Sequence, residues 1–192
     1  MDLKDKKVVF CMAGSFCMFK NTILQMKELV KEGANIIPIM SYIAYRTDTK
    51  FGKAKDFIKE IEELTGNKVV HTIKDVQQIV ENKIADVLIV APCTGNTLAK
   101  LSNGVYDSPV LMAVKVHLRN NIPIIIGIST PDGLSTNAEN IGKLLNRKNY
   151  FFIPFRQSNP ITKPNYLSFD PKYIKKTLEH GLNREQIQPI LL

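Results

Sequence analysis

The chain has no tryptophan and only three cysteines among its 192 residues. So few cysteines argue against two classes of protein, those held together by disulfides and those built around a metal site. An odd number of cysteines argues against a disulfide framework. Neither the cysteines nor the three histidines have the spacing of metal ligands, so the sequence predicts no metal site. Cys11 lies within an apolar run, where a free cysteine usually acts as a small core residue.

The sequence also has no long hydrophobic run. Its apolar segments are shorter than the roughly 18 residues that a membrane-spanning helix needs. The N-terminal residues lead directly into an apolar strand and lack the form of a signal peptide. We therefore expect a cytoplasmic protein that has no membrane partner.

Acidic residues are fewer than basic ones, which gives a net charge of +8. Only five of the 26 basic residues are arginines, and aromatic residues do not alternate with them as they do on surfaces that stack nucleic-acid bases. This pattern is typical of a lysine-rich solvated surface, so we expect no nucleic-acid partner. A basic surface would still attract an anionic small-molecule substrate.

What the chain does have is a regular alternation of apolar runs and amphipathic segments. The apolar runs predict six strands, at residues 7–12, 35–40, 68–71, 86–91, 123–129 and 150–154. Helices are expected between them, because apolar residues recur there at helical spacing. The alternation predicts one α/β domain, residues 1–192, with a mostly parallel six-stranded sheet between two layers of helices.

The C-terminal part departs from this alternation. Residues 155–170 contain prolines and show little periodicity, so we expect an irregular arm. Asp170 and Pro171 then give the N-cap and first-turn signature of a helix, which we expect over residues 171–181. Ser108 and Pro109 give the same signature for a helix that ends near residue 120.

The most informative stretch is residues 86–100, an apolar strand that runs into small polar residues and then a helix. Pro92 should end the strand, because proline has no N–H group for the sheet ladder. Thr94, Asn96 and Thr97 follow, beside the free N–H groups of a starting helix. Such a turn at the carboxyl end of a parallel strand is where open α/β sheets bind anionic ligands.

Four strand ends carry small polar residues of this kind, and the carboxyl ends of parallel strands lie along one edge of a sheet. Their hydroxyl and N–H groups could therefore converge on one phosphate-bearing ligand. Taken singly, each would more often be a helix cap. The candidate cofactor-binding residues are Gly14, Ser15, Ser41, Thr94, Gly95, Asn96, Thr97, Ser129 and Thr130.

Charged and amide side chains near these turns are candidates for binding the substrate. Arg46 follows the second strand, Lys100 lies in the helix after Asn96, and Asn140 lies in a later helix. Asn96 is the candidate catalytic residue. The chain lacks the G-x-G-x-x-G fingerprint and the P-loop, which argues against a nucleotide held in the usual way. It also shows no Ser-His-Asp arrangement.

These residues resemble a known family, the small FMN-binding flavoproteins related to cysteine decarboxylases and flavin prenyltransferases. The resemblance rests on Gly14-Ser15 after the first strand, on residues 64–69, and on residues 91–100 with Asp107. Residues 92–97 are similar to the P-A-S-A-N-T signature of that family. The resemblance implies a three-layer Rossmann-like flavoprotein fold over the chain.

The resemblance is closer to one branch of that family, the B subunits of dipicolinate synthase, and it spans nearly the whole chain. It rests on residues 38–42, 47–52, 107–113, 128–134 and 188–189. It implies a partner, the A subunit of dipicolinate synthase, which carries the NADP-binding domain, and FMN is the cofactor expected on this chain. It also implies a homo-oligomer, either a trimer or a multiple of trimers.

The same resemblance implies a reaction. The two subunits would oxidise a dihydro- or tetrahydrodipicolinate precursor, a small dicarboxylate, to dipicolinate during sporulation, in the mother cell of a spore-forming bacterium. Two alternatives stay open. The chain could be a non-catalytic protein that assembles with the A subunit, or an FMN-dependent enzyme similar to the decarboxylases and prenyltransferases.

Two departures from the decarboxylases weigh against the last alternative. Residues 78–81 read Gln-Ile-Val-Glu where decarboxylases carry a His-Ile-x-Leu segment, so their general acid or base is missing. Residues 129–132 read Ser-Thr-Pro-Asp in place of Pro-Ala-Met-Asn. Thr94-Gly95 also replaces a bulkier pair and should alter the flavin pocket.

Overall fold

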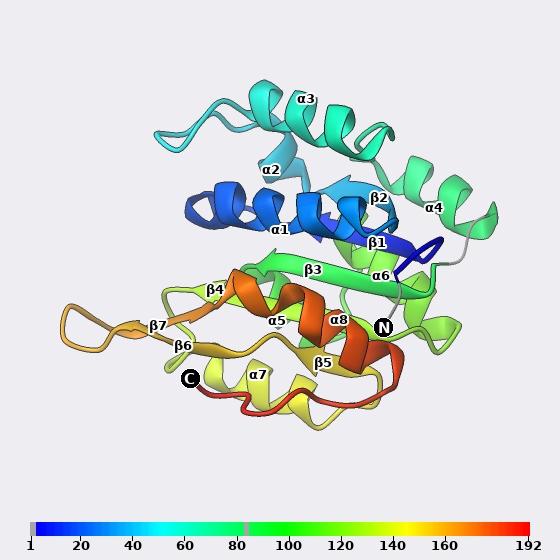
Figure 1. Ribbon diagram of the computed structural model, residues 1–192. Coiled ribbons are helices and arrows are strands. Elements are labelled where there is room, and N and C mark those ends of the chain that lie inside the picture. Colours follow the sequence, from blue (N-terminus) through cyan, green and yellow to red (C-terminus); the bar gives the residue numbers. More distant parts are fainter. Residues whose placement is uncertain (1–2, 83–84) are drawn as a thin grey trace.

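The computed structural model describes the backbone of residues 3–82 and 85–192, and the side chains of residues 79–82 lie outside that description. Within the described residues, seven strands form one sheet with a continuous path in the order β2-β1-β3-β4-β7-β6, while β5 also pairs with β4 (Figure 1). The parallel strands are β1 (Lys7–Met12), β2 (Asn35–Met40), β3 (Val87–Cys93), β4 (Ile124–Thr130) and β5 (Tyr150–Phe152).

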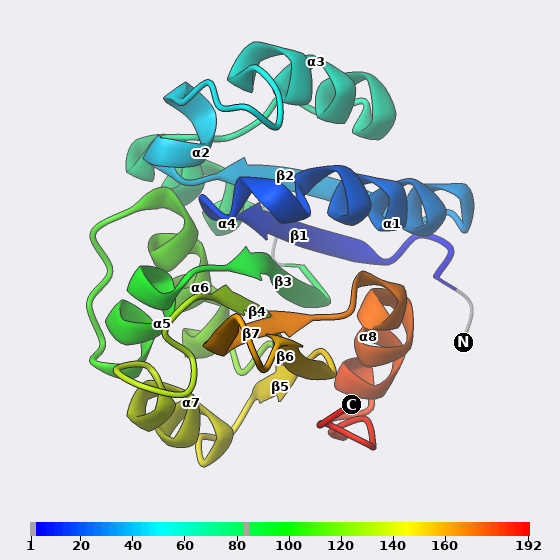
Figure 2. The ribbon, with the colours of Figure 1, turned by 90° about the vertical axis from the view of Figure 1, so that its left-hand side faces the viewer.

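Helices cover both faces of the sheet, which confirms the expected three-layer α/β fold. Figure 2 shows α1 (Phe19–Lys31) and α8 (Ile174–Leu182) on one side. On the other side lie α5 (Gly95–Ser102), α6 (Pro109–Arg119) and α7 (Ala138–Leu145). Short 3-10 turns, η1 (Phe16–Met18) and η2 (Pro171–Tyr173), lead into α1 and α8.

Three further helices lie at the β2 end of the sheet or beside α6. The short helix α2 (Tyr42–Arg46) directly follows β2, and α3 (Ala54–Thr65) packs against β2, α1 and α2. The helix α4 (Ile73–Asn82) packs against α6. The expected helix starts at Ser108 and Asp170 are confirmed, because each side chain accepts a hydrogen bond from a backbone N–H in the first turn.

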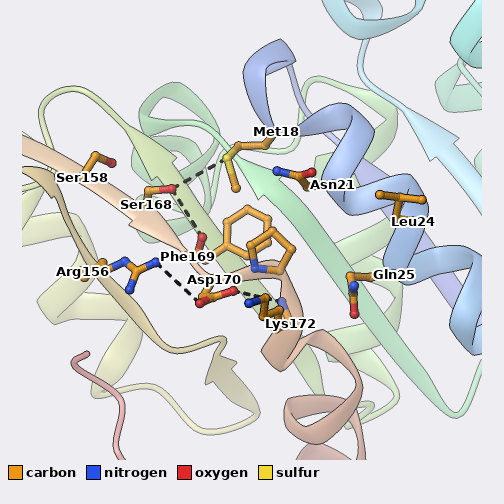
Figure 3. A pocket seen from close by; sticks show the side chains of 11 residues that line it. Met18, Asn21, Leu24, Gln25, Arg156, Ser158, Ser168, Phe169, Asp170 and Lys172 are labelled. Carbon is orange, nitrogen blue, oxygen red and sulfur yellow. Dashed lines mark hydrogen bonds and ion pairs between the residues drawn. The ribbon is translucent and has the colours of Figure 1, made fainter.

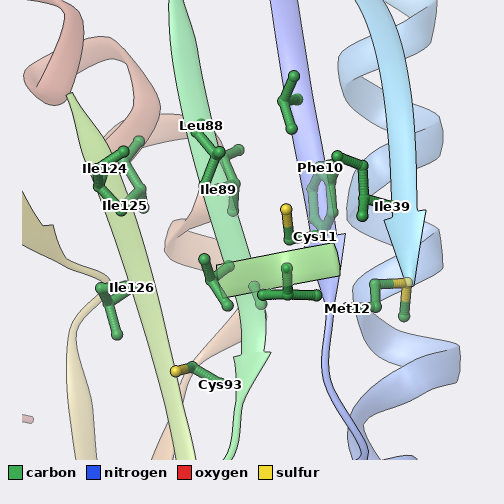
Figure 4. Close-up of a cluster of buried hydrophobic side chains, with 14 of the residues drawn as sticks. Phe10, Cys11, Met12, Ile39, Leu88, Ile89, Cys93, Ile124, Ile125 and Ile126 are labelled. Atoms are coloured by element: carbon green, nitrogen blue, oxygen red, sulfur yellow. The ribbon is translucent and has the colours of Figure 1, made fainter. Parts of the chain in front are cut away.

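The centre of the core is formed by the two middle strands. Every residue of β3 and of β4 is buried, as expected for parallel strands covered on both faces. Figure 4 shows Leu88, Ile125 and Phe10 among the side chains packed there. Each buried side chain of this size contributes about 1.5–3 kcal/mol. The strands are therefore a rigid base for the turns at their carboxyl ends.

The prediction of an irregular arm at residues 155–170 is wrong. These residues form an antiparallel hairpin of β6 (Phe155–Asn159) and β7 (Lys163–Phe169), which Figure 1 shows projecting from the body. The strand β7 also pairs antiparallel with the end of β4, Ser129 opposite Ser168. The sheet is accordingly seven-stranded rather than six-stranded and mixed at this edge.

Two strand predictions also need correction. The strand expected at 68–71 is reduced to an isolated bridge between Val70 and Ile39. The strand expected to stop before Pro92 continues to Cys93, with an irregular register between Val90 and Cys93. Pro92 lies within this irregular stretch, where its missing N–H group is tolerated, and its carbonyl accepts a hydrogen bond from the Ala13 N–H at 3.0 Å.

Candidate functional site

The turns after β1, β2 and β3 meet at the carboxyl edge of the sheet and line a pocket of about 430 Å³. This volume is within the usual range for small-molecule sites. Part of the wall is apolar, and the rest carries hydroxyl, amide and charged groups. The lining residues are Ala13, Gly14, Ser41, Tyr42, Ile43, Thr94, Asn96, Thr97, Lys100, Asp107, Ser108 and Leu111.

A second pocket of about 330 Å³ lies beside the first and shares Gly14, Thr94 and Asn96 with it. Its other walls come from the turns after β1 and β4. The remaining lining residues are Ser15, Gly95, Ser129, Thr130, Pro131 and Asp132. The nine residues proposed from sequence for cofactor binding therefore all line one or both of two adjoining pockets.

The hydroxyl groups in these pockets are held by contacts within the protein. Ser15 Oγ lies 2.7 Å from Ser129 Oγ, so the turns after β1 and β4 are joined directly. Ser41 Oγ accepts from the Ala44 N–H at 3.2 Å, and Thr94 Oγ1 accepts from the Thr97 N–H at 3.3 Å. Ser41 therefore keeps its own hydroxyl hydrogen to donate to an anion. Thr94 Oγ1 also lies 3.0 Å from Thr97 Oγ1, so one of these two hydroxyls donates to the other and only the second keeps a hydrogen for an anion.

Lys100 is the cation of the first pocket, and its charge is already paired. Its Nζ donates to both carboxylate oxygens of Asp107, at 2.9 and 2.7 Å. This hydrogen bond lowers the pKa of the Asp107 carboxyl, which keeps it ionised. The pair leaves the pocket close to neutral and fixes the position of the ammonium group.

Two of the substrate-binding candidates lie elsewhere. Arg46 is exposed at the end of α2, and its guanidinium carbon lies 5.8 Å from the ring centroid of Tyr42, a pocket residue. Asn140 is only 9% exposed, accepts from Ser102 Oγ at 2.5 Å and donates to Asn137 at 3.0 Å. Asn140 thus joins α5 to α7 and lines neither of the two pockets, and its predicted contact with substrate stays a prediction.

The atoms around Gly95 leave no room for a side chain at this position. A Cβ atom there would lie 2.5 Å from both Asn137 Nδ2 and Thr130 Oγ1, and 2.8 Å from Asp132 Oδ1. Asp132 accepts from Asn137 Nδ2 at 2.8 Å and from the Thr130 hydroxyl. Two of the departures noted in the sequence, at Gly95 and at Asp132, are therefore linked, because Asp132 and its partners occupy the space that a larger side chain at position 95 would need.

The cysteine in the signature segment is a packing residue. Cys93 and Cys11 are both fully buried on neighbouring strands, as Figure 4 shows. Burial raises the pKa of both thiols far above neutral pH, so they are uncharged. Neither thiol has the exposed, ionised character of a nucleophile.

Sequence reasoning missed three groups of the site. Tyr42 and Ile43 line the first pocket because the loop after β2 forms a helix, and Asp132 lines the second. Tyr166 Oη lies 3.3 Å from Ser129 Oγ, although the residues are 37 positions apart. Only the antiparallel pairing of β7 with β4 brings Tyr166 there, and no local pattern indicates that pairing.

Another cavity, of about 520 Å³, lies between α1, the hairpin and η2. Arg156 lies 3.6 Å from Asp170 on one wall of this cavity. Figure 3 shows this pair, with Asn21 and Leu24 of α1 facing it. None of the residues proposed from sequence lines it. In the described part of the chain, no cluster of residues could hold a metal ion, and no helix is long and apolar enough to cross a membrane.

Comparisons with known proteins agree with this geometry. The Flavoprotein family model matches residues 1–167. The dipicolinate synthase B subunit of Bacillus subtilis (strain 168) is 40% identical over 190 residues, which are 99% of this chain and 95% of that protein. The dipicolinate synthase B subunit from Bacillus halodurans C superposes with a TM-score of 0.92 and 38% identity, over 100% of this chain and 98% of that one.

An FMN-dependent cysteine decarboxylase has the same fold, with a TM-score of 0.70 and 17% identity over 95% of this chain and 98% of that one. At this identity the likeness concerns the fold alone. The family match and the two full-length relatives are stronger. The chain therefore belongs to the Flavoprotein family and, within it, to the group of dipicolinate synthase B subunits.

Proposed function

We propose that the two adjoining pockets bind FMN, and that the chain is one of two subunits of an oxidoreductase that makes dipicolinate. Its partner would be the A subunit of that enzyme, which would bring NADP, and the substrate would be a dihydro- or tetrahydrodipicolinate precursor. The observation that carries the proposal is the match along the whole chain to B subunits of that enzyme. Sporulation, the cytoplasm of the mother cell and a trimeric assembly belong to the same proposal.

The residues present fit a flavin mononucleotide. A phosphate needs hydrogen-bond donors, and Ser15, Ser129 and Thr97 offer hydroxyls beside the N-terminus of α5. A flat ring system needs an apolar wall, which Ile43 and Leu111 supply in the first pocket. Together the pockets give one end for an anion and another for a ring.

Charge in the site supports binding by hydroxyl and N–H groups rather than by free cations. Lys100 is paired with Asp107, and Asp132 adds a carboxylate to the second pocket. None of the residues that line the second pocket carries a positive charge. An anion there would therefore be bound by hydrogen bonds, and the hydroxyls of Ser15 and Ser129 are the groups that could donate them. Lys100 would orient a carboxylate of the substrate through its remaining N–H.

When bound, FMN supplies a two-electron acceptor for a hydride. The protein's own part is to bind and orient. Asn96 lines both pockets with a side chain that can donate and accept hydrogen bonds, so it would hold a ring or a substrate carboxylate between them. Holding two reactants in a fixed orientation is itself a large part of the rate that an enzyme provides.

A second candidate function is an assembly role, in which the chain supports the A subunit without taking part in catalysis. Large apolar side chains are exposed outside the two pockets, Ile161 at the hairpin tip by 90% and Leu191 near the C-terminus by 65%. Exposed apolar groups of this kind often belong to interfaces. The two functions differ in whether the pocket residues matter for turnover.

Replacing Asn96 distinguishes them. We expect Asn96→Ala to lower kcat of the reconstituted two-subunit enzyme by about tenfold or more, because the hydrogen bonds that orient the ligand are lost. Asn21→Ala is the matched control, since Asn21 is an exposed amide on α1 that lines the other cavity. The measurements are turnover with precursor, NADP and FMN, and complex formation by size-exclusion chromatography. Unchanged turnover in Asn96→Ala would support the assembly role instead.

A further inference from the structure

The cavity of about 520 Å³ between α1, the hairpin and η2 is an open groove, the α1–hairpin groove. Its walls come from residues other than those of the two pockets. Leu24, Arg156 and Lys172 on these walls are exposed, so solvent reaches the groove along its length. Figure 3 shows Leu24 and Gln25 of α1 across the groove from Arg156. Small-molecule sites bury most of their ligand, so an open groove is better suited to a segment of another chain.

The hairpin and η2 make the groove positively charged. Arg156 and Lys172 line it, and Asp170 is the acidic residue among the lining residues. The Asp170 carboxylate accepts from the Lys172 N–H at 3.1 Å and lies 3.6 Å from Arg156. The contact with Arg156 is longer than a hydrogen bond, and the Arg156 side chain is 57% exposed. Its guanidinium therefore keeps N–H donors for another carboxylate.

The wall formed by α1 places an apolar side chain between two lysines. Leu24 is 56% exposed, although leucine is usually buried. Lys20 and Lys27 lie four residues before and three residues after Leu24, so the three share one face of the helix. The neighbouring Glu28 is paired with Lys31 at 2.8 Å. This face of α1 therefore offers an apolar contact between two positive charges.

The walls of the groove are held in place before any partner binds. Lys175 of α8 donates to Glu32 of α1 at 2.6 Å, and Ser168 Oγ of β7 lies 3.7 Å from Met18 Sδ in η1. Ser168 also pairs with Ser129 of β4, which fixes the hairpin to the sheet. A preformed surface loses little conformational entropy on binding, which favours association.

Charge decides which occupant fits. A second copy of this chain is a poor match, because the chain has 26 basic and 18 acidic residues. Exposed carboxylates of the chain, such as Glu63 and Glu139, are also paired with its own lysines. A different protein that presents an acidic segment is the complementary partner.

We propose that the α1–hairpin groove is the docking surface for an acidic segment of the partner subunit. An apolar side chain of that segment would pack on Leu24, and its carboxylates would bind Arg156 and Lys172. This inference rests on the proposed function, which supplies the partner, the A subunit. Ser168 lines the groove and pairs with Ser129 of the second pocket, so the docked segment would lie one strand away from the proposed flavin site.

Affinity between the purified chain and the purified A subunit, measured by isothermal titration calorimetry, tests this surface. We expect Lys172→Glu to weaken binding by about tenfold or more, because the new carboxylate repels the acidic segment. Leu24→Gln should weaken it by about tenfold, since the apolar contact at the centre is lost. The matched controls are Lys148→Glu and Leu145→Gln, which change an exposed lysine and an exposed leucine outside the groove. They should leave the affinity within about twofold of the parent value, as should Asn21→Ala, which alters neither contact.

Competing anions test the nature of the occupant. Poly-L-glutamate should displace the A subunit from the parent chain, while inorganic phosphate at the same ionic strength should not. Displacement by phosphate alone would assign the groove to a small anion and overturn the proposal. The affinity of the parent should also fall as salt is added, and more steeply than that of Lys172→Glu.

Parent-like affinity in both Lys172→Glu and Leu24→Gln would overturn the docking surface, and so would equal weakening by the controls. A lower mass of the chain alone in Lys172→Glu, by light scattering, would assign the groove to a second copy instead. With saturating A subunit, Lys172→Glu should keep the kcat and the FMN affinity of the parent. A parent chain that binds the A subunit through the groove but binds no FMN would overturn only the proposed flavin site. A parent chain that does not bind the A subunit would overturn both proposals.

Discussion

At the residue scale, the site depends on a glycine, Gly95, because a side chain at this position would collide with neighbouring polar atoms. Gly95 begins α5 and lines the second pocket, and the Asp132 cluster fills the space beside it. The sequence showed that both residues depart from the decarboxylase pattern. It could not show that they touch, because they belong to turns after different strands.

Gly95→Ala tests this contact. The new Cβ would lie 2.5 Å from two polar atoms, so we expect about 1–3 kcal/mol lower free energy of unfolding in urea. Gly142→Ala is the control, because nothing lies within 4 Å of its Cβ position in α7. That change should raise stability by about 0.5–1 kcal/mol, as alanine favours a helix. A neutral effect of Gly95→Ala would contradict the packing described.

At the scale of elements, the buried parts were predictable and the exposed hairpin was not. The strands β1 and β2 occupy the residues expected, because unbroken apolar runs indicate strands buried on both faces. In β6, four of five residues are exposed, and Pro164 interrupts the polar start of β7. Without an alternating apolar pattern, the hairpin gave no signal, although its pairing with β4 shapes the site.

Asp170 links the hairpin to the C-terminal helix. Its carboxylate accepts from the Lys172 N–H at 3.1 Å and lies 3.6 Å from Arg156. We expect Asp170→Ala to lower the free energy of unfolding by about 1 kcal/mol, the usual value of an N-cap. Asp170→Asn keeps a capping oxygen and should lose much less, because a 3.6 Å ion pair with the exposed Arg156 contributes little. Equal losses in the two variants would assign the effect to charge rather than to capping.

At the scale of the whole molecule, parallel strands bring distant turns to one edge. This rule placed Gly14, Ser41, Asn96 and Ser129 together from the sequence alone, and the two pockets confirm that they are neighbours. The rule does not place side chains of a strand, such as β7, that pairs antiparallel with the parallel strands. Tyr166 was missed for that reason. Asn140 bonds to Ser102 at the end of α5 and lies outside both pockets.

The central claim is that this edge of the sheet binds FMN, and a titration of the purified chain with FMN, followed by flavin fluorescence, tests it most directly. We predict saturable binding of one FMN per chain. Ser129→Ala should weaken it by about tenfold, the effect of losing about 1.4 kcal/mol of hydrogen bonding. Ser158→Ala, in the other cavity, should leave it unchanged. Absence of saturable binding, or equal weakening by both variants, would contradict the account.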